Sequence, residues 1–322
     1  MRLSRRIRVS CGVEDSYAGS TVVDAPILWR GEPRWEIEGD MVARDLVRDF
    51  LGAAEEIPAN ARSKLTGQTE LWASGTAGTA PAWGPLMRAC GLAETITAAS
   101  RVEYTPISQD QESLRLKVNN DGVQYITKGN VGNAKLTLEA GALPLLDWEF
   151  RGVKVAYSEV AFGNPSTMAA WKKPQVIRDE NAGALLRGCT YTAGVLASGT
   201  AYNLRSLTVD LGNTIEYSEE LTNSLHWGQR QMITNREVKG EAVFAVTAAQ
   251  EVAIRSDIEN GVEASMGFKL GSVAGQKLVL FGRAVQLTTP QMERYNGMMY
   301  MRCGTRFLPS HTGNDELILA VM

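Results

Sequence analysis

Alternation of apolar and polar residues dominates the stretch from Ser113 to Gly152. Strand-length segments such as LRLKV at 114–118 and LDWEF at 146–150 place Leu, Val, Trp or Phe at every second position. A period of two puts one side of a strand in a core and leaves the other side in a polar setting. Asp121-Gly122 suits a tight hairpin between two such segments, because both residues tolerate positive φ. The pattern predicts an antiparallel sheet.

Similar patterns predict strands elsewhere in the chain. In the first half they cover 66–73 and 102–107. In the second half they cover 204–211, 214–217, 238–246, 264–270, 277–287, 298–307 and 317–321. The resulting fold class is mainly β, sandwich- or barrel-like.

Three segments have helical spacing. Thr247–Asn260 is the clearest, because Thr247 suits an N-cap, Gln250 completes a capping box and Gly261 follows the end. Its apolar residues Val252, Ile254 and Ile258 are expected to face a core. A short helix is predicted over Trp83–Thr95, with Pro85 in its first turn. Val42–Ala53 also has helical spacing, although a strand with a broken pattern fits it equally.

The cluster FGNPSTMAAWKKP at 162–174 is typical of a linker or a surface crossing. It divides the chain into a β domain over 1–165, which includes an N-terminal arm, and a second β-rich domain over 175–322. In each half a glycine-containing strand leads to one helix, and a run of hairpins follows. This shared order predicts one packed helix per half and an internal duplication.

Composition and charge argue against some classes of function. The chain has 322 residues, a formal net charge of −3 and 44% hydrophobic residues. Real cores are therefore expected, and tight nucleic-acid binding is disfavoured because it requires a basic surplus. The four cysteines lie far apart and the only histidines are His226 and His311. This spacing predicts buried free thiols and no metal site.

The basic start MRLSRRIRV carries no apolar run after it, and no membrane-length apolar stretch occurs. A secretory signal and a membrane span are therefore not expected. A solvated arm is the first interpretation of this basic N-terminal segment. An ordered edge strand and a contact with an acidic neighbour are the alternatives.

Enzyme motifs are missing. No GxSxG occurs, and GTAGT at 75–79 lacks the Gly-Lys-Ser/Thr that holds phosphates. GNVGN at 129–133 links strands, so a bulged β connection is expected instead of a dinucleotide site. Asp147 and Glu149 share the polar side of one strand, as any half-solvated sheet provides. We therefore expect no catalysis and no cofactor. The cluster Met298, Met299 and Met301 is interpreted as core filling first and an adaptable interface second.

Taken together, several segments resemble the tail tube proteins of long-tailed bacteriophages. They are ELWASGTAGTAPAWGPLMRACGLAET at 70–95, VEYTPIS at 102–108 and LKVNNDGVQYITKGNVGNAKLTLEAGALPLLDWEFRG at 116–152. The opening GVEDSYAG at 12–19 is similar to that family's E-x-x-Y-G segment, except that Ala18 precedes the final glycine. The similarity is best over residues 10–155.

The resemblance implies a structural protein that self-assembles into rings stacked as a hollow tube in the virion tail, made in the host cytoplasm. A duplicated domain would imply trimeric, pseudo-hexameric rings, and a single one hexamers. Other tail proteins would be partners, and DNA would pass without tight binding. Gln124, Thr137 and Glu139 are candidates to face the lumen. The alternative is a soluble β-sandwich module that binds a ligand or decorates a virion.

Overall fold

A computed structural model describes the chain except for residues 1–2, 4, 20–21, 165, 179 and 220–228. The described residues are 56% strand and 6% helix, so the protein is mainly β, as predicted. Every pairing between the described strands is antiparallel. Among the described residues no helix is long and apolar enough to cross a membrane.

The first half forms one set of elements. They are β1 (Ile7–Val13), β2 (Ala25–Ile27), β3 (Arg30–Ala43), β4 (Glu56–Glu70), α1 (Gly84–Arg88), β5 (Leu92–Thr97), β6 (Arg101–Pro106), β7 (Leu114–Asn120), β8 (Val123–Glu139) and β9 (Leu145–Glu159).

The second half forms the rest. They are β10 (Leu185–Arg187), β11 (Thr190–Thr192), β12 (Val195–Ala197), β13 (Thr200–Asp210), β14 (Asn213–Glu219), β15 (Gln229–Arg236), β16 (Lys239–Ala245), α2 (Ala248–Glu259), β17 (Glu263–Leu270), β18 (Leu278–Tyr295), β19 (Met298–Leu308) and β20 (Ile318–Val321).

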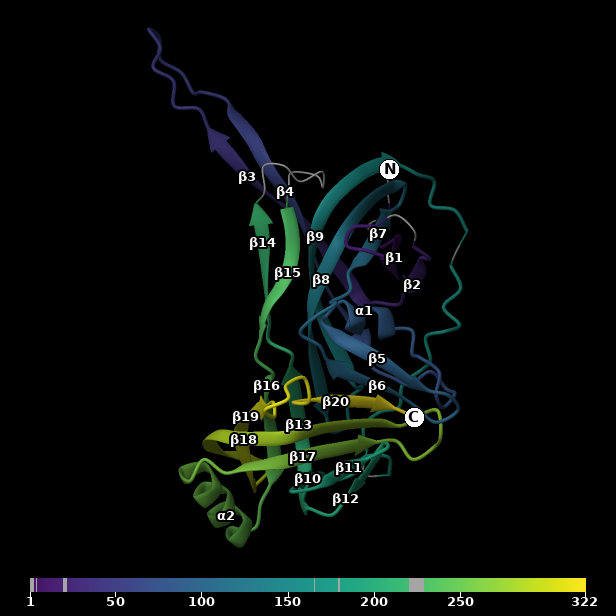
Figure 1. Cartoon of the computed structure of the whole chain (residues 1–322), viewed down its shortest axis with the longest axis vertical. Coiled ribbons are helices and arrows are strands. Elements are labelled where there is room, and N and C mark those ends of the chain that lie inside the picture. The colour runs from purple at the N-terminus through teal and green to yellow at the C-terminus, as the bar shows by residue number, and fades with distance from the viewer. Residues whose placement is uncertain (1–2, 4, 20–21, 165, 179, 220–228) are drawn as a thin grey trace.

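Strand pairing closes a barrel in the second half and forms all but one step of a matching cycle in the first half. In the second half β10 pairs with β13, β13 with β16, β16 with β19, β19 with β18, β18 with β17, and β17 with β10. In the first half β1 pairs with β2, β3 with β4, β4 with β9, β9 with β8, β8 with β7, and β7 with β1. Only Leu28 and Trp29 separate β2 from β3, so this chain connection completes the first cycle. We call these cycles the first and second barrels (Figure 1).

The two cycles contain corresponding pairings in the same chain order. β1, β2–β3, β4, β7, β8 and β9 correspond to β10, β13, β16, β17, β18 and β19. The correspondence extends to a bulge at the same place in the long hairpins. The register shifts between Lys128 and Val131 in β8 and between Thr288 and Gln291 in β18. The residue that follows the start of each bulge, Gly129 or Thr289, has positive φ.

Eight strands join into one continuous sheet, in the order β3-β4-β9-β8-β13-β16-β19-β18. Four come from each barrel, and the pairing of β8 with β13 joins the halves. The register there is Thr137 opposite Thr208 and Leu138 opposite Leu207. We call this the eight-strand sheet. Separately, β20 pairs with both β18 and β6, and a single apolar cluster contains buried residues of both halves.

Three sequence-based expectations need correction. Residues 44–55 contain no helix, and β3 ends at Ala43. The apolar residues of that segment have no core to contact, and helices depend on packing for most of their stability. α1 ends at Arg88, and Gly91 with φ 76° leads into β5, so the helix is shorter than predicted. Val252 is 69% exposed while Ile254 is 1% exposed. Two residues two apart lie on opposite sides of a helix, so they cannot both face a core.

The basic N-terminus is a further correction. From Ile7 onward the chain is β1, which lies between β2 and β7 rather than at an edge. Arg6 forms an ion pair with Asp121 at 3.0 Å, and Arg8 donates a hydrogen bond to the carbonyl of Asn164. From Ile7 an internal strand replaces the expected solvated arm, and Arg6 makes the contact with an acidic neighbour that was an alternative. Residues 1–2 and 4 lie outside the described residues.

Candidate assembly surfaces

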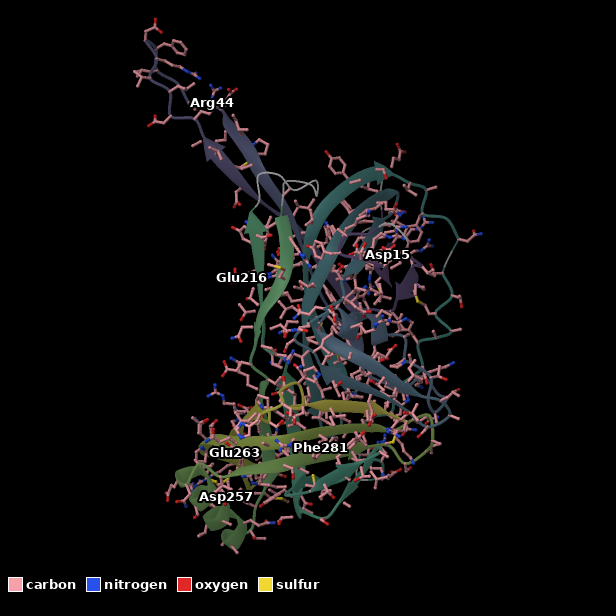
Figure 2. All side chains as sticks on the ribbon, in the orientation of Figure 1. Asp15, Arg44, Glu216, Asp257, Glu263 and Phe281 are labelled. Atoms are coloured by element: carbon pink, nitrogen blue, oxygen red, sulfur yellow. The ribbon has the colours of Figure 1, made fainter. Side chains whose placement is uncertain are left out.

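The β3–β4 hairpin projects away from both barrels (Figure 1). We call residues 37–57 the arm. Every residue from 37 to 53 is exposed, and Figure 2 shows Arg44 far from the rest of the chain, whereas Asp257 and Glu263 lie at the opposite end of the molecule. Large apolar side chains are among the exposed ones: Ile37, Met41, Val42, Leu46, Val47, Phe50, Leu51 and Ile57. Such a concentration of apolar side chains in water marks an interaction site.

The outer edge of β3 has no strand partner within the described parts of the chain, because β3 pairs only with β4. At the other end of the eight-strand sheet, β18 pairs with β17 only as far as Gln286. From Leu287 to Tyr295 it pairs, among the described strands, with β19 alone. Unpaired edges of this length are templates for pairing with another chain.

One face of the eight-strand sheet is polar. Residues directly opposite each other in antiparallel strands share a face. From Thr137 in β8 the row runs through Thr208 in β13, Glu241 in β16 and Gly304 in β19 to Thr288 in β18. The neighbouring row contains Asp147, Lys135, Asp210, Lys239 and Arg306. These two rows of polar and charged residues give the eight-strand sheet one wet face.

Charges of both signs alternate on that face. Lys64 and Arg151 each contact the Glu149 carboxylate, at 3.3 and 3.0 Å. Arg302 pairs with Glu293 at 2.6 Å, and the amide of Gln68 donates to Asp147 at 2.7 Å. The Asp147/Glu149 pair is thus engaged with neighbouring side chains of the sheet. A face of balanced charge attracts a polyanion only weakly.

The structure places the three candidate lumen residues unequally. Thr137 and Glu139 share the polar face of β8, where Thr137 is half-buried and Glu139 exposed. Gln124 lies at the other end of β8, opposite Asn119 and Ser158. Register shifts at Ile126/Thr127 and Lys128/Val131 separate it from the other two, so counting by twos does not carry the face across. A lumen-facing position for Gln124 stays a prediction, as it does for Thr137 and Glu139.

A second hairpin, β14–β15, emerges between β13 and β16, at the position where the arm emerges between β3 and β4. Unlike the arm, it lies against the first barrel, where it contacts β8 and β9 (Figure 1). Arg62 of β4 stacks on the ring of Tyr217 at 3.8 Å. The backbone N–H of Gln231 donates to the Tyr17 hydroxyl at 2.7 Å.

The carboxylate of Glu14 is buried in the segment that also contains Tyr17, the residue that contacts this hairpin. Glu14 accepts hydrogen bonds from the N–H groups of Ala18 and Gly129 and from the hydroxyl of Ser113. Desolvation outweighs these hydrogen bonds and raises the pKa of the Glu14 carboxyl. Burial also raises the pKa of the Tyr17 phenol to about 12. Glu14 is buried and its neighbour Asp15 is exposed, and both residues line an open cleft of about 500 Å³.

All four cysteines are free and buried, as predicted. Burial raises the pKa of the Cys11 thiol to about 12 and that of Cys303 to about 11. The described residues contain no cluster of His, Cys, Asp and Glu able to hold a metal ion. His226 lies outside the described residues. These thiols are protonated and unreactive near neutral pH.

The methionine cluster divides between two roles. Met301 is fully buried in the core, whereas Met298 and Met299 are 63% and 45% exposed at the end of the β18–β19 hairpin. β3 was not predicted from the sequence, apart from its last two residues. Its signal was the alternation of Trp35 and Ile37 with two glutamates at 36 and 38.

No known family model matches the chain, and a search of curated proteins also returns no match.

Proposed function

We propose that the protein is a structural subunit that associates with copies of itself into stacked rings, and that these rings form the hollow tail tube of a bacteriophage. The observation that carries the proposal is the eight-strand sheet, which has one wet face and two edge strands, β3 and β18, without partners among the described residues. A sheet with open edges gains stability when copies pair edge to edge, and closure into a ring leaves no edge exposed.

In such a ring the polar face of the sheet would line the channel. The interleaved ion pairs on this face favour passage of DNA, because a surplus of positive charge would hold phosphates in place. Thr137 and Glu139 would face the lumen. The role is architectural, and neither a cofactor nor a catalytic step belongs to it.

The arm supports stacking. Its exposed apolar side chains lie well away from the barrels, where they can reach a neighbouring subunit (Figure 2). Burying a large apolar side chain contributes about 1.5–3 kcal/mol. Several of them in contact with another copy would stabilise an assembly substantially.

Electron microscopy and light scattering of the purified protein test the proposal. Rings or tubes, with a mass that is a multiple of the 35.0 kDa chain, are expected. Removal of the arm tip, residues 44–55, should abolish stacking while the far-ultraviolet circular dichroism stays that of a β protein. A chain that remains a monomer at every concentration contradicts the proposal and favours a soluble binding or virion-decorating module instead.

A further inference from the structure

The junction inside one chain provides a template for the junction between two chains. Within the chain, β13 of the second barrel pairs along the edge of β8 that extends beyond β7. By the correspondence of the barrels, β3 is the equivalent of β13, and β18 is the equivalent of β8. Both equivalents have an edge without a strand partner among the described residues, and these edges are the two ends of the eight-strand sheet.

The corresponding positions differ in burial in the way that a missing partner predicts. Arg62 in β4 corresponds to Glu241 in β16, and these residues pair with Glu38 and Thr208. The residues that precede Glu38 and Thr208, Ile37 in β3 and Leu207 in β13, are therefore equivalent. Leu207 is fully buried opposite Leu138, whereas Ile37 is 42% exposed. The same strand position is thus covered in one barrel by the neighbouring barrel and uncovered in the other.

The β18 edge also carries exposed apolar side chains. The bulges align Val131 with Gln291, so that Lys135 corresponds to Tyr295. Tyr295 is 46% exposed, and Met298 beyond it is 63% exposed. Apolar side chains therefore line both open edges.

We infer that the β3 edge of one chain pairs antiparallel with the β18 edge of a second copy, which repeats between chains the β13–β8 pairing within the chain. The template pair Asp210 and Lys135 places Asp40 of one copy opposite Tyr295 of the next. The two edges are different, so the contact is head to tail and propagates until the rotation closes a ring. First and second barrels then alternate around the ring. This inference rests on the self-assembly proposed above and specifies which edges meet.

Cysteine cross-linking of the assembled protein tests the register. Residues directly opposite in an antiparallel pair have Cα atoms about 4.5–5.5 Å apart, within disulfide reach. The four native cysteines are buried, so background coupling is low. Asp40→Cys and Tyr295→Cys are made in separate chains, mixed, assembled and oxidised. A covalent dimer is expected from the mixture and from neither variant alone, and the double variant should give a ladder of higher multimers.

Two controls calibrate the experiment. Lys135→Cys with Asp210→Cys probes the template junction and should link within one chain, without a dimer. Asp40→Cys alone reports pairing of two β3 edges. A dimer from Asp40→Cys alone, or an assembly that forms without any dimer in the mixture, would overturn the inference.

A charge at the edge provides a second readout that does not depend on disulfide geometry. Ile37→Lys should prevent assembly, because pairing would bury the ammonium group. The matched control is Val252→Lys, which alters an exposed apolar residue on α2. It should assemble as the wild type does. Assembly of Ile37→Lys at wild-type concentration contradicts the inference. Tubes formed with another edge pairing leave the proposed function intact, whereas a lone monomer overturns both.

Discussion

Glu14 accepts hydrogen bonds from the backbone N–H of Gly129 with both oxygens of its carboxylate, at 3.1 and 3.0 Å. The two residues are 115 positions apart. Gly129 has φ 60° at the bulge of β8, and a Cβ there would lie 2.5 Å from the ring of Tyr17. The hydrogen bonds therefore connect the bulge of β8 to the segment that follows β1.

Replacing Glu14 by alanine should destabilise the protein. The substitution leaves the N–H groups of Ala18 and Gly129 and the hydroxyl of Ser113 without their buried acceptor. Each buried donor without a partner costs about 1–3 kcal/mol. Urea denaturation should show a lower free energy of unfolding for Glu14→Ala. The control is Asp15→Ala at the cleft wall, where a change within about 0.5 kcal/mol is expected.

The same carboxyl should make stability depend on pH. Its pKa is raised in the folded state above the ordinary value of 4.5. Its contribution to stability is therefore fully present below pH 4.5 and is lost as pH rises through the folded-state pKa. Relative to Glu14→Gln, which cannot titrate, the wild type should lose stability over this rise. Urea titrations over this interval measure the difference, and a gain with rising pH would contradict the assignment.

Tyr17→Phe should loosen the β14–β15 hairpin. The substitution removes the hydroxyl that accepts the N–H of Gln231, while the ring that stacks under Arg230 at 4.7 Å remains. Hydrogen exchange followed by mass spectrometry should show faster exchange in residues 213–219 and 229–236. Peptides from β17 and β18 serve as the internal reference. Faster exchange across the whole chain would show general destabilisation instead.

The capping box of α2 should be measurable in stability. The Thr247 hydroxyl accepts from the N–H of Gln250, whose side chain accepts from the N–H of Thr247. Thr247→Ala should cost about 0.5–2 kcal/mol in thermal or urea denaturation. Thr247→Ser keeps the hydroxyl and should retain most of the stability. Equal losses for both variants would show that the methyl group of Thr247, not the cap, is responsible.

Gly132→Ala tests the close packing of β8 on β9. An added Cβ would lie 2.5 Å from the ring of Phe150, which is fully buried and stacks on Trp148. Overpacking of this kind costs about 1–3 kcal/mol. Gly52→Ala is the control, because nothing lies within 4 Å of its Cβ position. A stability unchanged by Gly132→Ala would mean that the Phe150 ring moves freely aside.

Local patterns account for what the sequence predicted correctly. Alternation located β7, β8 and β9, and Asp121-Gly122 turns between two of them with φ values of 42° and 102°. The capping box at Thr247 was also readable, because a cap involves residues three apart. Thr137 and Glu139 were placed on a polar face by the same period of two.

Residues far apart decided the rest. The sequence order of parts predicted a duplication, but only the register of β8 with β13 shows how the halves join. The bulges that separate Gln124 from Thr137 depend on β7 and β9, and residues 44–55 lack a helix because no core lies beside them. Periodicity assigns each strand a wet and a dry side. Which strand lies beside it, and whether its edge is covered, depends on long-range pairing, and a local pattern carries no information about that.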